Sequence, residues 1–92
     1  MSSTIVQNVK LVNELGMHAR AAAQFVKKAG EFKSEIKIRK NNIEVNGKSI
    51  LGLLMLAMPV GDTFEIQATG GDASEAVNAL TDLVSARFGE SK

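Results

Sequence analysis

The sequence contains no cysteine, no tryptophan and no tyrosine, and it has only one histidine, His18. Without cysteine the chain can form no disulfide, no thiolate metal site and no thiol nucleophile. A single histidine excludes a histidine-rich metal site and any mechanism that needs two imidazoles, so we expect no metal and no cofactor. If histidine chemistry takes place in this chain, it takes place at His18.

The chain also lacks a strong charge bias and long apolar runs. Its formal net charge is +1, and a nucleic-acid binder would usually have a basic bias and stacking aromatics, so we expect no nucleic-acid partner. No apolar run reaches the roughly 18 residues of a membrane span, and the N-terminus does not read as a signal peptide. We therefore expect one cytoplasmic domain over residues 1–92, without membrane insertion.

Strands are predicted where apolar and polar residues alternate. The alternation runs through residues 4–12, 34–39 and 63–69. A shorter alternation through 43–45 follows the turn Lys40-Asn41-Asn42, which predicts a hairpin. Each predicted strand has one polar face, which is typical of an antiparallel sheet that is solvated on one side.

Three other segments have the periodicity of helices. The first covers residues 19–29 and ends at Gly30, a typical C-cap. A short apolar helix begins after Ser49 and extends to about residue 57, and a last helix, with Asp72 as its predicted N-cap, extends to about Phe88. The order β-α-β-β-α-β-α predicts a two-layer α+β sandwich.

The segment Leu15-Gly16-Met17-His18-Ala19-Arg20 lies where the first loop becomes the first helix. The first N–H groups of a helix have no intrahelical partner, and the helix dipole favours negative charge there. Arg20 can donate two hydrogen bonds to a phosphate or carboxylate, and Gly16 allows backbone conformations that a side chain would obstruct. These features predict an anion site beside the His18 imidazole.

A phosphoryl group carried covalently on His18 would use all of these parts. Neutral imidazole is a nucleophile near physiological pH, and a helix N-terminus disfavours the imidazolium. The N–H groups of Ala19, Arg20 and Ala21, together with the Arg20 guanidinium, would then hold the phosphoryl oxygens. The alternative is that His18 is a capping or surface residue, which is the commoner role of a histidine at a helix start.

Two segments resemble a known family. The hexapeptide, followed by Ala22-Ala23-Gln24-Phe25-Val26, resembles the phosphohistidine segment of HPr, the phosphocarrier of the bacterial phosphoenolpyruvate-dependent sugar phosphotransferase system. The segment Asn46-Gly47-Lys48-Ser49-Ile50-Leu51-Gly52 resembles the regulatory-serine segment of the same family. The resemblance covers essentially the whole chain. It implies an open-faced β-sandwich, with a four-stranded antiparallel sheet covered on one face by three helices, in a monomeric protein.

The resemblance also implies a role. His18 would accept a phosphoryl group from phosphorylated enzyme I and pass it to an enzyme IIA domain, and Arg20 would contact that group. The chain would be a carrier and not an enzyme. In one departure, Ala21 stands where the family usually has proline. Proline suits the first turn of a helix, because an N–H at that position would have no intrahelical partner and its absence costs nothing. Ala21 restores a donor but loosens the junction, so we expect phosphorylation at an altered rate.

Ser49 has two interpretations. As the residue before the short second helix it would be an N-cap, which alone explains a serine there. The resemblance implies instead that Ser49 is phosphorylated by an ATP-dependent HPr kinase/phosphorylase. A phosphate at a helix N-terminus is stabilised, so the two roles are compatible.

Three apolar residues of the second helix, Ile50, Leu51 and Leu54, are candidates for a docking surface. They could belong to the core, as we expect for Leu53 and Leu56. The resemblance places the three on the surface near His18, where an exposed apolar patch is typical of a partner-binding site.

The resemblance adds Met17, Ala23 and Lys27 to the docking surface. We prefer Lys27 to Lys28 because it is nearer to the helix face that carries Arg20, although it could simply be a solvated lysine. The methionines in general, including Met17, are expected to pack in the interior, as are Met55 and Met58.

Three functions remain open on the sequence alone. The first is a carrier of the sugar system, which the segment around Ser49 favours. The second is the related carrier of a nitrogen-regulatory branch, since the segment around His18 is common to both. The third is an α/β binding module that never carries phosphate.

Overall fold

The structure is a computed structural model and describes residues 3–92. It contains four strands, three α-helices and a 3-10 turn among these residues. In chain order the elements are β1 (Ser3–Lys10), α1 (Ala19–Ala29), β2 (Glu35–Lys40), β3 (Ile43–Asn46), α2 (Ile50–Met55), β4 (Thr63–Gly70), α3 (Ala73–Ser85) and the 3-10 turn (Arg87–Gly89).

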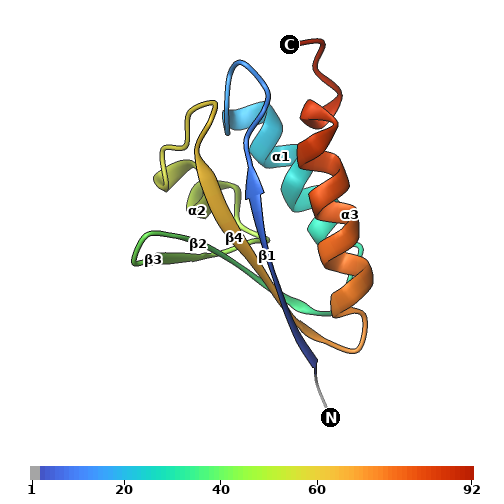
Figure 1. Cartoon of the computed structure of the whole chain (residues 1–92). Coiled ribbons are helices and arrows are strands. Elements are labelled where there is room, and N and C mark those ends of the chain that lie inside the picture. The colour runs from blue at the N-terminus through green and yellow to red at the C-terminus, as the bar shows by residue number, and fades with distance from the viewer. Residues whose placement is uncertain (1–2) are drawn as a thin grey trace.

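The strands form one antiparallel sheet in the order β1-β4-β2-β3. Helix α3 contacts β1, β4 and α1, and α2 contacts β3 and α1. Figure 1 shows α1 and α3 lying along the sheet, with α2 near the β2–β3 hairpin. The predicted four-stranded antiparallel sheet with three helices on one face is therefore confirmed.

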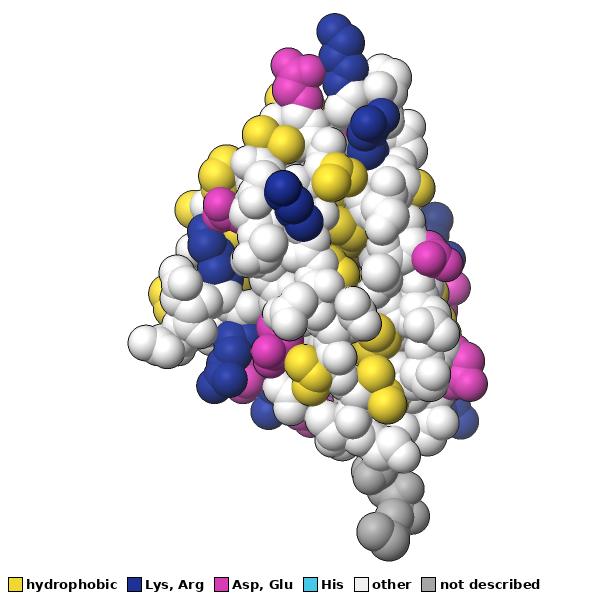
Figure 2. All heavy atoms as spheres, in the orientation of Figure 1, with side chains coloured by type: hydrophobic (Ala, Val, Ile, Leu, Met, Phe, Trp, Pro, Cys, Tyr) yellow, Lys and Arg dark blue, Asp and Glu magenta, His cyan; other side chains and the backbone are white. Residues whose placement is uncertain are grey.

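The core lies between the sheet and the helices. Alternate residues of β2 and β4 point inward, as their sequence pattern predicts. The rings of Phe25 on α1 and Phe64 on β4 meet edge to face, with centroids 6.4 Å apart. On the side shown in Figure 2, apolar side chains form several small groups, with charged side chains between and around them, and no histidine is visible.

Two element ends differ from the sequence-based prediction. Strand β1 ends at Lys10, because Leu11 instead exchanges hydrogen bonds with the segment before β4: its N–H donates to the carbonyl of Asp62 and its carbonyl accepts from Gly61. Helix α3 ends at Ser85, and not near Phe88. Arg87 and Phe88 have left-handed backbone angles, with φ of 58° and 54°, which a helix cannot continue. The turn still buries Phe88, as the apolar pattern predicts.

The predicted N-cap Asp72 precedes α3, but its side chain does not cap that helix. Its carboxylate accepts hydrogen bonds from the backbone N–H groups of Lys33 and Ser34, at 2.8 and 2.9 Å, and from the Ser34 hydroxyl. Asp72 thus joins the start of α3 to the start of β2.

Candidate functional site

The loop between β1 and α1 has a fixed shape. Gly16 adopts φ 66°, and a Cβ there would lie only 2.5 Å from the carbonyl oxygen of Met58. The N–H of Met17 donates to that same oxygen at 2.9 Å, and the side-chain amide of the fully buried Asn13 donates to the carbonyl of Gly16 at 2.8 Å. These contacts fix the chain direction as it enters α1.

His18 is the N-cap residue of α1, with an extended backbone (φ −90°, ψ 177°). Its carbonyl accepts the N–H of Ala22 at 2.8 Å, so the N–H groups of Ala19, Arg20 and Ala21 precede the first intrahelical bond. Ala19 and Arg20 are exposed, whereas Ala21 is buried in the core. The predicted junction of loop and helix at His18 is confirmed, and anion binding by these groups stays a prediction.

The imidazole of His18 does not bind the end of its own helix. Its Nε2 lies 2.5 Å from Oε2 of Glu90, and the side chains of His18 and Glu90 are 27% and 9% exposed. Nδ2 of Asn13 donates to the other carboxylate oxygen of Glu90 at 3.0 Å. The sequence did not predict that Glu90 and Asn13 belong to this site. Glu90 is 72 residues away from His18 in the sequence, and the residues around Asn13 form no pattern that indicates a contact with His18.

Opposing influences act on the Glu90 carboxyl group. Burial raises its pKa, but the hydrogen bonds from Asn13 and His18 and the charges of His18 and Arg20 lower it, and the net pKa is below its usual value. Glu90 therefore lies in the site as a carboxylate.

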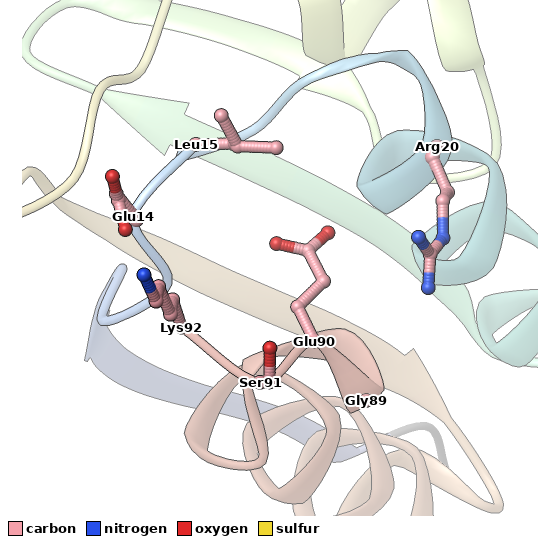
Figure 3. Close-up of a pocket in the computed structure, with 7 residues that line it drawn as sticks. All are labelled: Glu14, Leu15, Arg20, Gly89, Glu90, Ser91 and Lys92. Carbon is pink, nitrogen blue, oxygen red and sulfur yellow. The ribbon is translucent and has the colours of Figure 1, made fainter.

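A pocket of about 490 Å³ opens beside this carboxylate. Figure 3 shows Glu90 extending from the C-terminal segment toward the loop before α1, with Arg20 facing the pocket from α1. The pocket wall also contains Glu14, Leu15, Gly89, Ser91 and Lys92. Charges of both signs thus line it, and Arg20 supplies the cationic group nearest in sequence to His18.

Ser49 is the N-cap of α2, as predicted. Its Oγ accepts the backbone N–H of Gly52 at 3.0 Å, and the residue is half-buried. The structure therefore accounts for a serine at this position, and phosphorylation of Ser49 stays a prediction.

The apolar residues of α2 divide between surface and core. Ile50, Leu51 and Leu54 are exposed and Leu53 is fully buried, in agreement with their expected placement. The expectation that Met55 packs in the interior is wrong, since its exposed fraction is 72%. The exposed surface of α2 thus consists of Ile50, Leu51, Leu54 and Met55, which we call the α2 patch.

Of the other predicted docking residues, Ala23 and Lys27 are exposed on α1. Lys28 is partly covered and lies 3.4 Å from Glu31, so Lys27 is the more available of the two cations. Met17 is 5% exposed and packs in the core, as expected of the methionines, and its docking role stays a prediction.

Within residues 3–92, no group of three or more histidine, cysteine, aspartate or glutamate residues is arranged to hold a metal ion. None of the helices described is long and apolar enough to cross a membrane.

Fold and site together define a small open-faced β-sandwich with one histidine at the start of its first helix. The family model described as PTS HPr component phosphorylation site matches residues 5–86. The phosphocarrier protein HPr of Neisseria meningitidis is 49% identical over 84 residues, which cover 91% of this chain and 94% of that protein. The phosphocarrier protein NPr of Shewanella violacea is 40% identical over 84 residues, which cover 91% of this chain and 92% of that protein.

The crystal structure of HPr-C-His from Thermoanaerobacter tengcongensis superposes with a TM-score of 0.92 and 40% identity, covering 96% of this chain and 99% of that one. The chain therefore belongs to the HPr family of phosphocarrier proteins of the phosphotransferase system. It is a carrier and not an enzyme, in agreement with the name phosphocarrier protein that its relatives bear.

Proposed function

We propose that this chain is a cytoplasmic, monomeric carrier that accepts a phosphoryl group on His18 from phosphorylated enzyme I and donates it to an enzyme IIA domain of a sugar phosphotransferase system. The observation that carries the proposal is the position of His18, the only histidine of the chain, as the N-cap of α1 in a member of the HPr family.

The surroundings of His18 support phosphoryl transfer. The free N–H groups at the start of α1 and the exposed guanidinium of Arg20 supply positive potential where a phosphoryl group on the ring would lie. Transfer between two histidines is an in-line displacement that positioning and charge assist. No cofactor takes part in this step.

The exposed side chains of α1 and α2 support docking to larger partners. The α2 patch is apolar, and Lys27 adds a cation on α1. An apolar patch with a charged rim is typical of a protein interface, and the rim charge favours association with acidic partners. We therefore propose that enzyme I and enzyme IIA bind at the α2 patch.

The direct test is to incubate the purified chain with enzyme I and labelled phosphoenolpyruvate. We expect one phosphoryl group per chain, stable to alkali and labile to acid, and none on His18→Ala. Because the chain has a single histidine, the labelled position is unambiguous. Failure of the wild-type chain to take up label would contradict the carrier role and favour a binding module that carries no phosphate.

The nitrogen branch is the second candidate, because an NPr is among the relatives at 40% identity. The identity to an HPr is higher, at 49%, and the segment around Ser49 favours the sugar branch. Initial rates with enzyme I of each branch decide between them. We expect the larger kcat/KM with the sugar-branch enzyme, and the opposite order would assign the chain to the nitrogen branch.

We also propose that HPr kinase/phosphorylase phosphorylates Ser49. The N-cap position supports this, since phosphate there adjoins the unpaired N–H groups of α2. With kinase and ATP, we expect label on the wild-type chain and on Ser85→Ala, which alters an exposed serine of α3. Equal labelling of Ser49→Ala would refute the assignment.

A further inference from the structure

A chain of hydrogen bonds joins His18 to Glu90 and Glu90 to Asn13. We propose that Glu90, oriented by Asn13, is a positioning residue that fixes the tautomer of His18 and balances the positive charge that the ring gains on phosphorylation. The second half of this inference rests on the proposed carrier function. The first half concerns the unphosphorylated ring and does not depend on it.

Asn13 orients the carboxylate. Its fully buried side-chain amide donates to Oε1 of Glu90 at 3.0 Å and to the carbonyl of Gly16 at 2.8 Å. With the amide flipped, its oxygen would face these two acceptors, which is repulsive, so only one orientation of Asn13 is compatible with the site. Glu90 is therefore held by a residue of the same loop that leads to His18.

The contact with Glu90 determines which ring nitrogen carries the proton. An ionised carboxylate only accepts hydrogen bonds. Since Oε2 of Glu90 lies 2.5 Å from Nε2, the neutral imidazole must carry its proton on Nε2. The lone pair is then on Nδ1, for which no hydrogen-bond partner is found in residues 3–92. Nδ1 is thus the nitrogen available to attack phosphorus.

The same contact supports the charge change during transfer. The lone pair of Nδ1 forms the new N–P bond while the P–N bond of the donor breaks, and that bonding pair returns to the donor's ring nitrogen. Nε2 of His18 keeps its proton, so the ring becomes a phosphoimidazolium whose N–H still faces the Glu90 carboxylate. Onward transfer reverses these changes, and no proton has to enter or leave the ring. A fixed carboxylate at this position stabilises the charge without reorganisation.

The matched variants are Glu90→Gln and Glu14→Gln. The first keeps the size of the side chain but removes its charge, and the amide it introduces can donate to Nε2 as well as accept from it. Glu14 lines the same pocket and is exposed, and within residues 3–92 His18 forms its side-chain hydrogen bond with Glu90 and not with Glu14. The two variants thus remove the same charge from the same pocket, with and without the contact to the ring.

The first measurement is the ¹⁵N chemical shifts of the His18 ring at a pH at which it is neutral. We expect the Nε2–H tautomer in the wild-type chain and in Glu14→Gln, and a mixture of tautomers in Glu90→Gln. The second is the rate of phosphorylation by phosphorylated enzyme I. We expect kcat to fall about tenfold in Glu90→Gln, the effect of a charged hydrogen bond, with KM unchanged.

Two results would overturn the inference. One is an unchanged tautomer in Glu90→Gln. The other is faster phosphorylation of this variant, which would mean that Glu90 slows the reaction of His18. If Glu90→Gln is poorly folded by its amide spectrum, Glu90→Ala with and without added formate replaces it, and we expect formate to restore part of the rate. An unlabelled wild-type chain contradicts the carrier function instead, and the tautomer measurement, which needs no phosphoryl donor, then decides the role of Glu90 by itself.

Discussion

The carboxylate of Asp72, at the start of α3, accepts the backbone N–H of Ser34, at the start of β2, at 2.9 Å. The two residues are 38 positions apart, and the same carboxylate also accepts the Ser34 hydroxyl and the N–H of Lys33. Ser34 is buried, so its polar groups need partners inside the protein. Asp72 supplies them and connects the helical layer to the sheet.

This contact makes stability depend on pH. The hydrogen bond from the Ser34 hydroxyl, and then the one from Lys33 N–H, hold the pKa of Asp72 below its usual value of 3.8 in the folded protein. The stabilisation is therefore complete above the unfolded-state pKa and is lost as the pH falls through the folded-state pKa. In urea unfolding, we expect Asp72→Asn to be less stable than the wild type at neutral pH, and this difference to shrink below pH 3.8.

Asp82→Asn is the control for Asp72→Asn. Asp82 is an exposed residue of the same helix, and its carboxylate has no hydrogen-bond partner in the part of the chain that the structure describes. We expect its unfolding free energy to stay near that of the wild type at neutral pH. An equal loss in both variants would show that the helix charge, and not the contact with Ser34, is responsible.

Leu53 and Leu54 are neighbours on α2 with opposite environments. Leu53 is fully buried, and Leu54 is 36% exposed in the α2 patch. We expect Leu53→Ala to lower the free energy of unfolding by about 2–5 kcal/mol, since it leaves a cavity, and Leu54→Ala to change it by less than about 1 kcal/mol. Urea unfolding measures both.

Phosphorylation kinetics test whether Leu54 also contributes to docking. If the α2 patch binds enzyme I, Leu54→Ala raises KM severalfold and leaves the folded protein intact, because an apolar contact in the interface is lost. A KM equal to that of the wild type would contradict docking through Leu54.

Gly16 is required by both backbone conformation and space. Its φ is 66°, and an added Cβ would contact the backbone of Met58 and Pro59 at 2.5–2.9 Å. We expect Gly16→Ala to cost at least about 1 kcal/mol of stability and to slow phosphorylation, because His18 follows two residues later. Gly71→Ala, where a Cβ meets nothing within 4 Å, serves as the control and is expected to be near neutral in both measurements.

The fold could be predicted from the sequence because each strand and helix is encoded locally. The alternation in β2 and β4 and the apolar face of α1 indicate which side of each element is buried. The end of α3 could not be predicted, because Leu83, Val84 and Phe88 continue the helical spacing. Only the left-handed backbone at Arg87 and Phe88 shows that the chain turns before Phe88 reaches the core.

The candidate site could be predicted only where its residues are adjacent in sequence. His18 and Arg20 belong to one short segment, whereas the contact of His18 with Glu90 depends on the packing of α3 and the turn that follows it. The error at Met55 has a similar cause. A methionine suits either environment, so only tertiary packing shows that Met17 is buried and Met55 exposed.

Lys27 and Lys28 differ in availability to a partner. Lys27 is exposed, whereas Lys28 is partly covered and lies 3.4 Å from Glu31. We expect Lys27→Ala to lower kcat/KM with phosphorylated enzyme I severalfold at low salt, because a rim cation assists association with an acidic partner. The loss should diminish as salt screens the interaction above about 0.1 M.

Lys28→Ala removes the same charge one position away and should have the smaller effect. Equal effects of the two variants would mean that only the net charge of the helix matters, and a larger effect of Lys28→Ala would place the docking contact on the other side of α1.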